Sequence, residues 1–370
     1  MISIPETNTS DNQSLLSIDS SDSVLFRSTA VRICILCLLL PIPIFAFMGN
    51  LFIMAAMARI QSLWTPTNAF VVSLAVADFL VAVLVMPFSL VRSIDTWHFG
   101  DCFCRVHFIL DVTFCTCSIF NLSCIALERY IAICDPLHYP ARMAPRSVAV
   151  LLLLCWILPL IISTICVSFG MYTPSPAAVL NSSTQGDTQI CPTTFNVPFA
   201  VATSVMSFFI PMIFMLFAYG KIFIVAQKQA RWIHAIAHHT EQLQMTQSPL
   251  RMNSSRQVQA QMDRFSLKKE SKAAKTLGLI MGVFLFCWLP FFCLNMIHPL
   301  KGYRISPLIL EASTWLGYAN SSLNPFLYVL FNKNYRQMFV SLLDCGILGK
   351  SPSLKSGRQT HSVNLETISR

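Results

Sequence analysis

Long runs of apolar residues alternate with short polar segments along most of the chain. Seven of these runs are long enough for a membrane-crossing helix, which needs about 20 residues with few charges. Backbone groups in lipid must find their hydrogen bonds within the same segment, so we expect every run to be helical. The predicted spans are residues 32–59, 67–92, 104–134, 147–171, 196–228, 273–297 and 307–331. The pattern predicts an all-α membrane protein, a seven-transmembrane helix bundle followed by a short amphipathic eighth helix.

The composition agrees with this pattern and suggests how the chain is divided. Only 12% of the 370 residues are charged and 54% are hydrophobic, whereas a soluble domain carries about 25% charged residues. Residues 1–30 are rich in Ser, Asp and Asn and show no apolar core of a signal peptide, so we predict a disordered N-terminus. The bundle with helix 8 is assigned to residues 31–342, with an intracellular loop at about 229–270, and a cytoplasmic tail to residues 343–370.

Basic residues are concentrated between spans five and six, between spans three and four, and after span seven. Lysine and arginine near span ends favour the cytoplasmic side of a membrane. We therefore predict a multi-pass plasma-membrane protein with an extracellular N-terminus, and we interpret the net charge of +9 as an orientation signal rather than a nucleic-acid site. Sequons on the predicted outer side indicate glycosylation at Asn8, Asn12 and Asn181.

Most of the 14 cysteines fall within apolar spans, where cysteine packs as a small apolar residue. Cys104, at the outer end of span three, and Cys191, in the outer loop before span five, lie on the oxidising side and are candidates for a disulfide. Cys102 competes for the same partner. Cys345, in the amphipathic stretch after span seven, is a candidate palmitoylation site, with an ordinary free thiol as the alternative.

Other classes of protein find little support in the sequence. No Gly-x-Ser-x-Gly elbow or His-Glu-x-x-His pair marks an enzyme. Seven spans without an internal repeat fit a transporter of amines poorly. His234, His238 and His239 form a histidine cluster between spans five and six, but a solvated loop explains them better than a metal site does.

Each span carries at least one short motif, and the motifs follow a fixed order. They are Gly49-Asn50-Leu51, Leu74-Ala75-Val76-Ala77-Asp78, Glu128-Arg129-Tyr130, Trp156, Pro211 with Tyr219, Cys287-Trp288-Leu289-Pro290 and Asn324-Pro325-Phe326-Leu327-Tyr328. No single motif is specific, but the ordered set is. On these residues the chain resembles rhodopsin-like G-protein-coupled receptors.

This resemblance implies an activation switch at the cytoplasmic ends of the spans. Arg129 would pair with Glu128 and with Glu270 when the receptor is inactive, because arginine and carboxylate groups pair with specific geometry. Release of these pairs would let span six swing outward and admit a helix of a heterotrimeric G protein. Further switch residues implied by the family are Ile119, Tyr130, Pro211, Tyr219, Phe284, Asn324, Pro325 and Tyr328. Arrestin and a receptor kinase are additional expected partners.

The same resemblance implies an allosteric sodium site between the spans, and no other cofactor. Its expected ligands share hard oxygen atoms. They are Asp78, Ser118, Asn320, Ser321 and Asn324. For any one Asn or Ser, hydrogen bonding between helices is the simpler interpretation. Asp78 is harder to explain in that way, because a carboxylate inside a membrane needs a cation or a proton.

Asp111 indicates the class of ligand. It lies about two turns inside span three, too deep for a solvated carboxylate. No Lys or Arg is expected at a matching depth in the other spans, so an internal salt bridge is the weaker interpretation. Asp111 resembles the residue that anchors the ammonium group in biogenic-amine receptors, which predicts a small protonated amine as the ligand.

Other residues are assigned to the same pocket by helical spacing and by the resemblance. They are Thr113, Cys115, Thr203, Ser204, Ser207, Trp288, Phe291, Phe292, Asn295, Glu311 and Tyr318. The aromatic rings would enclose an aryl group and an ammonium, and Tyr318 would hydrogen-bond Asp111. Core packing of the rings and bonding of each hydroxyl to its own helix remain the alternatives.

Two groups of amine receptors share further motifs with the chain. Ala274-Lys275-Thr276-Leu277-Gly278 resembles trace amine-associated receptors, whereas Trp315-Leu316-Gly317-Tyr318 resembles the type-four serotonin receptor, and the residues after Phe331 depart from the trace amine pattern. An aryl-ethylamine ligand, in an olfactory or central tissue, is favoured over serotonin. Both groups imply a stimulatory G protein and a rise in cyclic AMP. Glu311 would hold a second ammonium if the ligand is a diamine or polyamine, with a solvated acid as the alternative.

Overall fold

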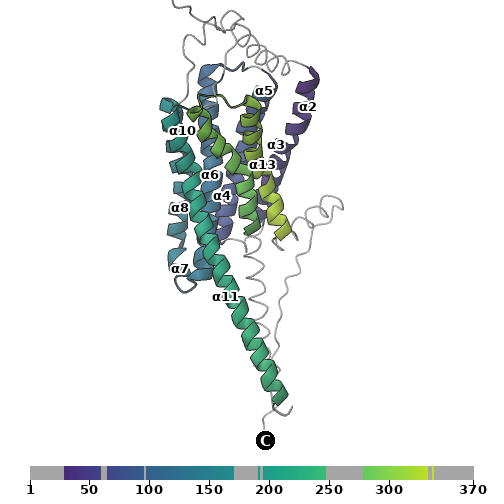
Figure 1. Ribbon diagram of the computed structural model, residues 1–370, viewed down its shortest axis with the longest axis vertical. Helices are drawn as coiled ribbons and strands as arrows, with labels where there is room; N and C mark the ends of the chain where they lie inside the picture. Colours follow the sequence, from purple (N-terminus) through teal and green to yellow (C-terminus); the bar gives the residue numbers. More distant parts are fainter. Residues whose placement is uncertain are drawn as a thin grey trace, which may run out of the picture. The chain divides into compact units, whose positions relative to one another are not determined.

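The computed structural model describes residues 29–59, 65–95, 97–170, 191, 195–246, 278–331 and 336, with the backbone alone for residues 229, 230 and 233–246. The elements of these described residues are helices (Figure 1). The helices are α2 (Thr29–Leu39), α3 (Pro41–Arg59), α4 (Pro66–Leu80), α5 (Met86–Ile94), α6 (Gly100–Cys134), α7 (Tyr139–Arg142), α8 (Pro145–Gly170), α10 (Val197–Ser204), α11 (Ile210–Thr246), Gly278–Leu300 and α13 (Pro307–Phe331). Two π-helical turns, η2 (Val81–Val85) and η4 (Val205–Phe209), join α4 to α5 and α10 to α11.

Six helical segments in the described part of the chain are long and apolar enough to cross a membrane, and they coincide with the first six predicted spans. The seventh predicted span is the 25-residue helix α13, which is less apolar because it carries Asn320, Ser321 and Asn324. All three side chains are buried. The polar groups of α13 therefore lie inside the protein, where lipid does not reach them, and the predicted helical membrane bundle is confirmed.

Large apolar side chains lie on the outside of the helices. Phe169, Ile213 and Phe286 are exposed by 73%, 62% and 70%. A soluble protein rarely exposes so many large apolar groups together. Asn50 and Asp78, by contrast, are almost fully buried. This reversal suits a protein whose outer surface contacts lipid and whose polar groups must bond to one another.

The long helix α6 packs against α4, α8 and α11 (Figure 1). Side chains tie the surrounding helices together, since the Asn50 amide on α3 donates to the carbonyl of Ser321 on α13 at 3.0 Å. A side chain at Gly49 would place its Cβ 2.8 Å from Cγ of Pro325, so this glycine allows α3 and α13 to approach closely. The motif residues of spans one and seven therefore meet directly.

Both π-helical turns lie just before a proline. Pro87 follows η2 and Pro211 follows η4. Proline offers no N–H and its ring collides with the carbonyl four residues earlier, so a wider turn before it relieves the clash. Each wide turn also rotates the faces of the helix that follows it. The outer part of α5 consequently presents different residues from those that a regular helix would present.

The helix of the fifth span continues beyond the span itself. The apolar span ends at Lys228, next to the start predicted for the intracellular loop, and α11 runs on as a helix to Thr246, beyond its neighbours in Figure 1. Residues 229–246 contain no glycine or proline and include several alanines and glutamines. These residue types favour helix without requiring an apolar stripe, so the loss of apolar periodicity did not mark the end of the helix.

The chain divides into two compact units, residues 1–327 and 328–370, each described by itself. Tyr328 begins the second unit. Several predictions fall outside the described residues. They are the N-terminal segment, helix 8, the tail, Asn8, Asn12, Asn181, Glu270 and Cys345.

Candidate functional site

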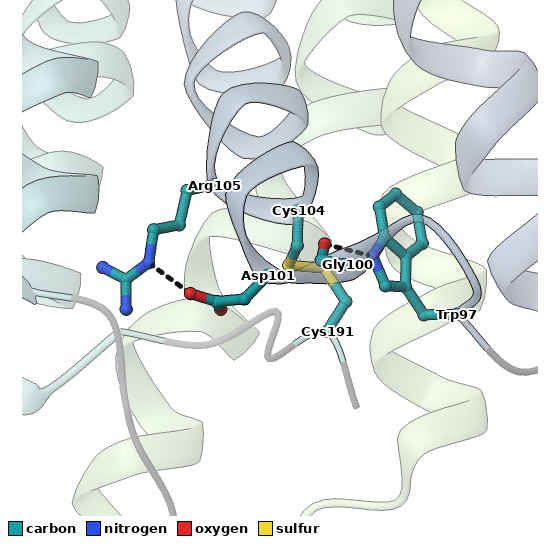
Figure 2. A network of polar contacts seen from close by, with 6 residues as sticks. All are labelled: Trp97, Gly100, Asp101, Cys104, Arg105 and Cys191. Atoms are coloured by element: carbon teal, nitrogen blue, oxygen red, sulfur yellow. Dashed lines mark hydrogen bonds and ion pairs between the residues drawn. A yellow bond between two sulfur atoms is a disulfide. The ribbon is translucent and has the colours of Figure 1, made fainter. Parts of the chain in front are cut away.

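One end of the bundle is closed by a disulfide, and we call it the disulfide end. Figure 2 shows Cys104, in the first turn of α6, bonded to Cys191. Trp97 packs beside them, and its indole N–H donates to the carbonyl of Gly100 at 2.9 Å (Figure 2). Cys102 is exposed and free. Of the two cysteines that competed for Cys191, the structure therefore pairs Cys104.

A cavity of about 950 Å³ lies between the helices at the disulfide end. Its walls come from α5, α6, α10, η4, the helix Gly278–Leu300 and α13. Most residues assigned to the ligand pocket from the sequence line it. They are Asp111, Cys115, Thr203, Ser207, Trp288, Phe291, Phe292, Asn295, Glu311 and Tyr318. Most of the residues that were assigned to one pocket from the sequence therefore line the same cavity in the folded chain.

Asp111 is the acidic group deep in this cavity. Its side chain is held on both oxygens, since the Tyr318 hydroxyl donates to Oδ2 at 2.7 Å and the Cys115 thiol to Oδ1 at 3.4 Å. The residue is 8% exposed. A carboxylate so deeply buried and bonded only to neutral groups leaves its charge uncompensated, which is costly unless a cation binds.

Aromatic rings form the cavity wall on the side of the helix Gly278–Leu300, to which most of them belong. The rings of Trp288 and Phe292 lie 5.6 Å apart, and Phe292 stacks on Phe208 of η4 with centroids 4.5 Å apart. A side chain at Gly317 would place its Cβ 2.7 Å from the Trp288 ring, so this glycine lets the indole lie against the backbone of α13. Such a wall offers apolar contact to an aryl group and ring faces to an ammonium.

The hydroxyls of the fifth span divide into two groups. Thr203 lines the cavity, but its hydroxyl donates to the carbonyl of Phe199 in its own helix at 2.6 Å. The Ser207 hydroxyl is buried and has no hydrogen-bond partner among the described residues. Ser207 is therefore better placed than Thr203 to bind a polar group of a ligand.

Two residues assigned to the pocket do not line it. Thr113 faces α8, where its hydroxyl bonds that of Ser163 at 2.6 Å. Two residues along a helix correspond to a rotation of about 200°, so Thr113 lies opposite Asp111. Ser204 lies behind Asn295 and accepts a hydrogen bond from its amide at 3.0 Å. Ser204 therefore contributes to the cavity only indirectly, because its hydrogen bond orients the side chain of Asn295.

Arg92 corrects another expectation. It was counted as the end of span two, yet it lines the same cavity as Asp111. A chain of polar groups that the sequence did not reveal leads away from Asp111 through Tyr318. In this chain Ser89 lies 3.2 Å from the Tyr318 hydroxyl and 3.5 Å from Nε2 of His107. Nε2 also lies 3.2 Å from the carbonyl of Val85. A carbonyl only accepts, so we assign the proton of His107 to Nε2.

The Glu128-Arg129-Tyr130 motif lies at the opposite end of α6. Arg129 forms an ion pair with the buried Glu128 at 3.0 Å and a hydrogen bond to Thr67 on α4. Glu128 also accepts a hydrogen bond at 2.7 Å from Tyr139, in the short helix α7. Burial, this hydrogen bond and the charge of Glu128 raise the pKa of Tyr139 to about 12, so the phenol stays a donor at neutral pH. Tyr139 was missed because its loop shows no periodicity.

Further predicted switch residues lie within the bundle, among them Ile119 in the middle of α6 and Tyr130 near its far end. Ile119 and Phe284 are buried, and the Phe284 ring lies 5.7 Å from Phe208. Tyr219 is close enough to Arg129 for the two side chains to interact electrostatically. Tyr130 packs its ring 6.3 Å from Phe217.

Asp78 lies in the middle of the bundle. Ser321 donates to its Oδ1 at 2.8 Å and Asn324 to its Oδ2 at 2.7 Å. The Ser118 hydroxyl is buried beside the carboxylate and interacts with it more weakly than Ser321 and Asn324 do. Each carboxylate oxygen keeps a free lone pair. These oxygens and the Ser118 hydroxyl are of the kind that a sodium ion accepts.

Comparison with known proteins identifies the family to which these features belong. Residues 49–328 match the model of the seven-transmembrane receptors of the rhodopsin family. The guinea-pig (Cavia porcellus) 5-hydroxytryptamine receptor 4 is 37% identical over 320 residues, 85% of this chain and 80% of the relative. Trace amine-associated receptor 4 of Mus musculus is 36% identical, covering 86% of this chain and 87% of the relative. The D(1A) dopamine receptor of Didelphis virginiana is 36% identical, covering 94% of this chain and 81% of the relative.

Proposed function

The chain belongs to the rhodopsin family of seven-transmembrane receptors, and we propose that it detects a small protonated amine and signals through a heterotrimeric G protein. Relatives named for serotonin, trace amines and dopamine share one chemical feature in their ligands, an ammonium group close to an aryl ring. We propose an aryl-ethylamine of the trace amine type as the ligand, bound in the cavity at the disulfide end. That end faces outward, with the N-terminus, from the plasma membrane.

A single observation supports this proposal most strongly. The Asp111 carboxylate lies deep in an aromatic cavity and is bonded only to the neutral groups of Tyr318 and Cys115. An ammonium would neutralise the carboxylate while its aryl group packed against Trp288 and Phe292. Ser207 would then bind a hydroxyl of the ligand. Because serotonin, dopamine and tyramine all have such a group, the site supports the amine class more firmly than any one amine.

The proposal is tested by measuring cyclic AMP in cells that express the full chain. We expect tyramine, tryptamine, serotonin or dopamine to raise cyclic AMP, because the proposed G protein is stimulatory. N-acetyltryptamine is the matched control, since it keeps the ring and loses the charge. An N-acetyl compound as potent as its parent amine would contradict the proposal.

Glu311 favours a second candidate, a diamine ligand. It lines the same cavity as Asp111 and is partly exposed. A second ammonium at Glu311 would, however, approach the positive charge of Arg92, which the sequence did not place here. We therefore rank the diamine below the monoamine, and a potency of 1,5-diaminopentane that falls in Glu311→Gln would reverse this order.

Tyr139→Phe is expected to raise basal signalling. The change removes the hydrogen bond that holds Glu128 and so loosens its ion pair with Arg129. A half-exposed bond of this kind contributes about 1 kcal/mol, so the active fraction should rise about fivefold. Basal cyclic AMP per receptor at the cell surface measures the effect. An unchanged basal level in both Tyr139→Phe and Glu128→Gln would argue that the contacts of Glu128 with Tyr139 and Arg129 do not hold the receptor inactive.

Sodium is proposed to stabilise the inactive receptor at Asp78, where Ser118 and the free lone pairs of the carboxylate supply hard oxygens. We expect agonist affinity to fall severalfold when sodium chloride replaces choline chloride. Asp78→Asn should remove this dependence, because the amide keeps the size of the side chain and one accepting oxygen but carries no charge. A sodium effect that persists in Asp78→Asn would place the ion elsewhere.

A further inference from the structure

Arg92 is a basic residue that the proposed amine site does not use. It stands near the end of α5, lines the cavity and is only partly exposed. Its Nη1 atom is buried and has no hydrogen-bond partner among the described residues. A buried guanidinium nitrogen without an acceptor loses its hydration without compensation. The cavity is therefore lined by an arginine with an unpaired donor and by an acid without a cationic partner.

The nearby carboxylates do not neutralise Arg92. Asp95, three residues further on, forms an ion pair with Arg32 of α2 at 3.5 Å. Glu311 lines the same cavity but does not form an ion pair with Arg92 in the part of the chain that the structure describes. Asp111 is bonded to Tyr318 and Cys115. Arg92 thus remains available to an acceptor that comes from outside.

The position of Arg92 relative to Asp111 is set by contacts between α5 and α13. Ser93 accepts a hydrogen bond at 3.1 Å from the Trp315 indole, and the Trp315 ring lies 5.4 Å from that of Tyr318. Arg92 lines the same cavity as Tyr318, whose hydroxyl is bonded to Asp111. A cation and an acid therefore lie within reach of one small molecule.

We propose that Arg92 and Asp111 together form a two-charge site for a zwitterionic ligand, an amine that also carries a carboxylate. The ammonium would bind Asp111, so this inference rests on the proposed function. The carboxylate would bind the guanidinium, whose forked N–H groups match its two oxygens. The site selects for the acid because a neutral amide offers the guanidinium only one accepting oxygen and no negative charge.

The test compares acids with near-isosteric neutral amides on the purified full-length receptor. The probes are 4-(2-aminoethyl)benzoic acid, 4-aminobutanoic acid and 6-aminohexanoic acid, each paired with its primary amide. Affinity is measured from the shift of thermal unfolding with ligand concentration. We expect at least one acid to bind about tenfold or more tightly than its amide, because a charge-assisted pair replaces a desolvated cation.

Arg92→Gln should remove this preference by lowering affinity for the acid about ten- to a hundredfold, with little effect on the amide. Arg92→Lys should keep part of the preference, because lysine keeps the positive charge but lacks the paired N–H groups that match both carboxylate oxygens. Arg105→Gln is the matched control, because it removes an exposed arginine that lies outside the cavity lining and should leave the preference for the acid unchanged. The ratio of acid to amide affinity is taken on one preparation, so a poorly expressed variant still gives a result.

Three outcomes would overturn the two-charge site. They are a wild-type receptor on which no acid exceeds its amide, a preference that survives in Arg92→Gln, and tighter binding of 1,5-diaminopentane than of every acid. Asp111→Asn reports separately on the proposed function, because it should weaken acid and amide alike. If it leaves amide binding unchanged, the amine anchor is wrong, whereas a lost acid preference with an intact anchor refutes only the role of Arg92.

Discussion

Asp111→Asn should abolish the response to protonated amines at concentrations that saturate the unmutated receptor. The amide keeps the shape of the side chain and its contact with Tyr318 but has no charge for an ammonium. Removing one member of a buried charge pair costs about 2–5 kcal/mol, which corresponds to a loss of affinity of about 30-fold to several thousandfold. Cyclic AMP and radioligand binding, normalised to surface receptor, measure the change.

Glu311→Gln is the natural control for that experiment. It removes a carboxylate from the same cavity, but from a partly exposed position near the start of α13. A small change in monoamine potency is expected there, because the acid is more solvated than Asp111. If Asp111→Asn kept full potency while Glu311→Gln lost it, the ammonium would bind near Glu311 and the deep anchor would be refuted.

Cys104→Ser should remove most of the folded receptor from the cell surface. The disulfide with Cys191 joins α6 to a residue 87 positions later and is buried in a cluster that includes Trp97 and Phe195. Loss of a native disulfide typically costs about 2–5 kcal/mol, a large share of the stability of most folds. Surface labelling at 37 °C and the unfolding temperature in detergent report the loss.

Cys102→Ser provides a matched control two residues away. Cys102 is exposed and free, so its replacement should leave surface expression and the unfolding temperature unchanged. Cys191→Ser should behave as Cys104→Ser does, and the double variant should be no worse than either single variant. Equal losses from Cys102→Ser and Cys104→Ser would mean that the thiols exchange partners.

The sequence predicted the parts of the fold that depend on hydrophobicity and helical spacing. Apolar runs located the spans because lipid requires a continuous helix of nearly fixed length. The hydrogen bond between Asp111 and Tyr318 was predicted from the resemblance to amine receptors, and it is present. The contact of Asp111 with Cys115, one turn away on the same face, follows from helical spacing.

The sequence failed where the backbone departs from regularity or where a loop folds back. Arg92 follows η2, and a π-helical turn shifts every later side chain around the helix axis. Its place in the cavity was therefore hidden by an assumption of even spacing. Ser204 precedes η4, which separates its direction from that of Ser207 in a similar way. Tyr139 reaches Glu128 from a short helix outside the spans, where hydropathy carries no information.

The bare backbone at Gly317 has a mechanical consequence. The Trp288 indole lies directly against that stretch of α13, in the space that a methyl group at position 317 would fill. The indole cannot rotate toward α13, and a displacement of α13 toward the indole must push the tryptophan aside. The positions of α13 and of the Trp288 ring are thus sterically coupled at Gly317, so that a ligand that displaces one of them must also displace the other.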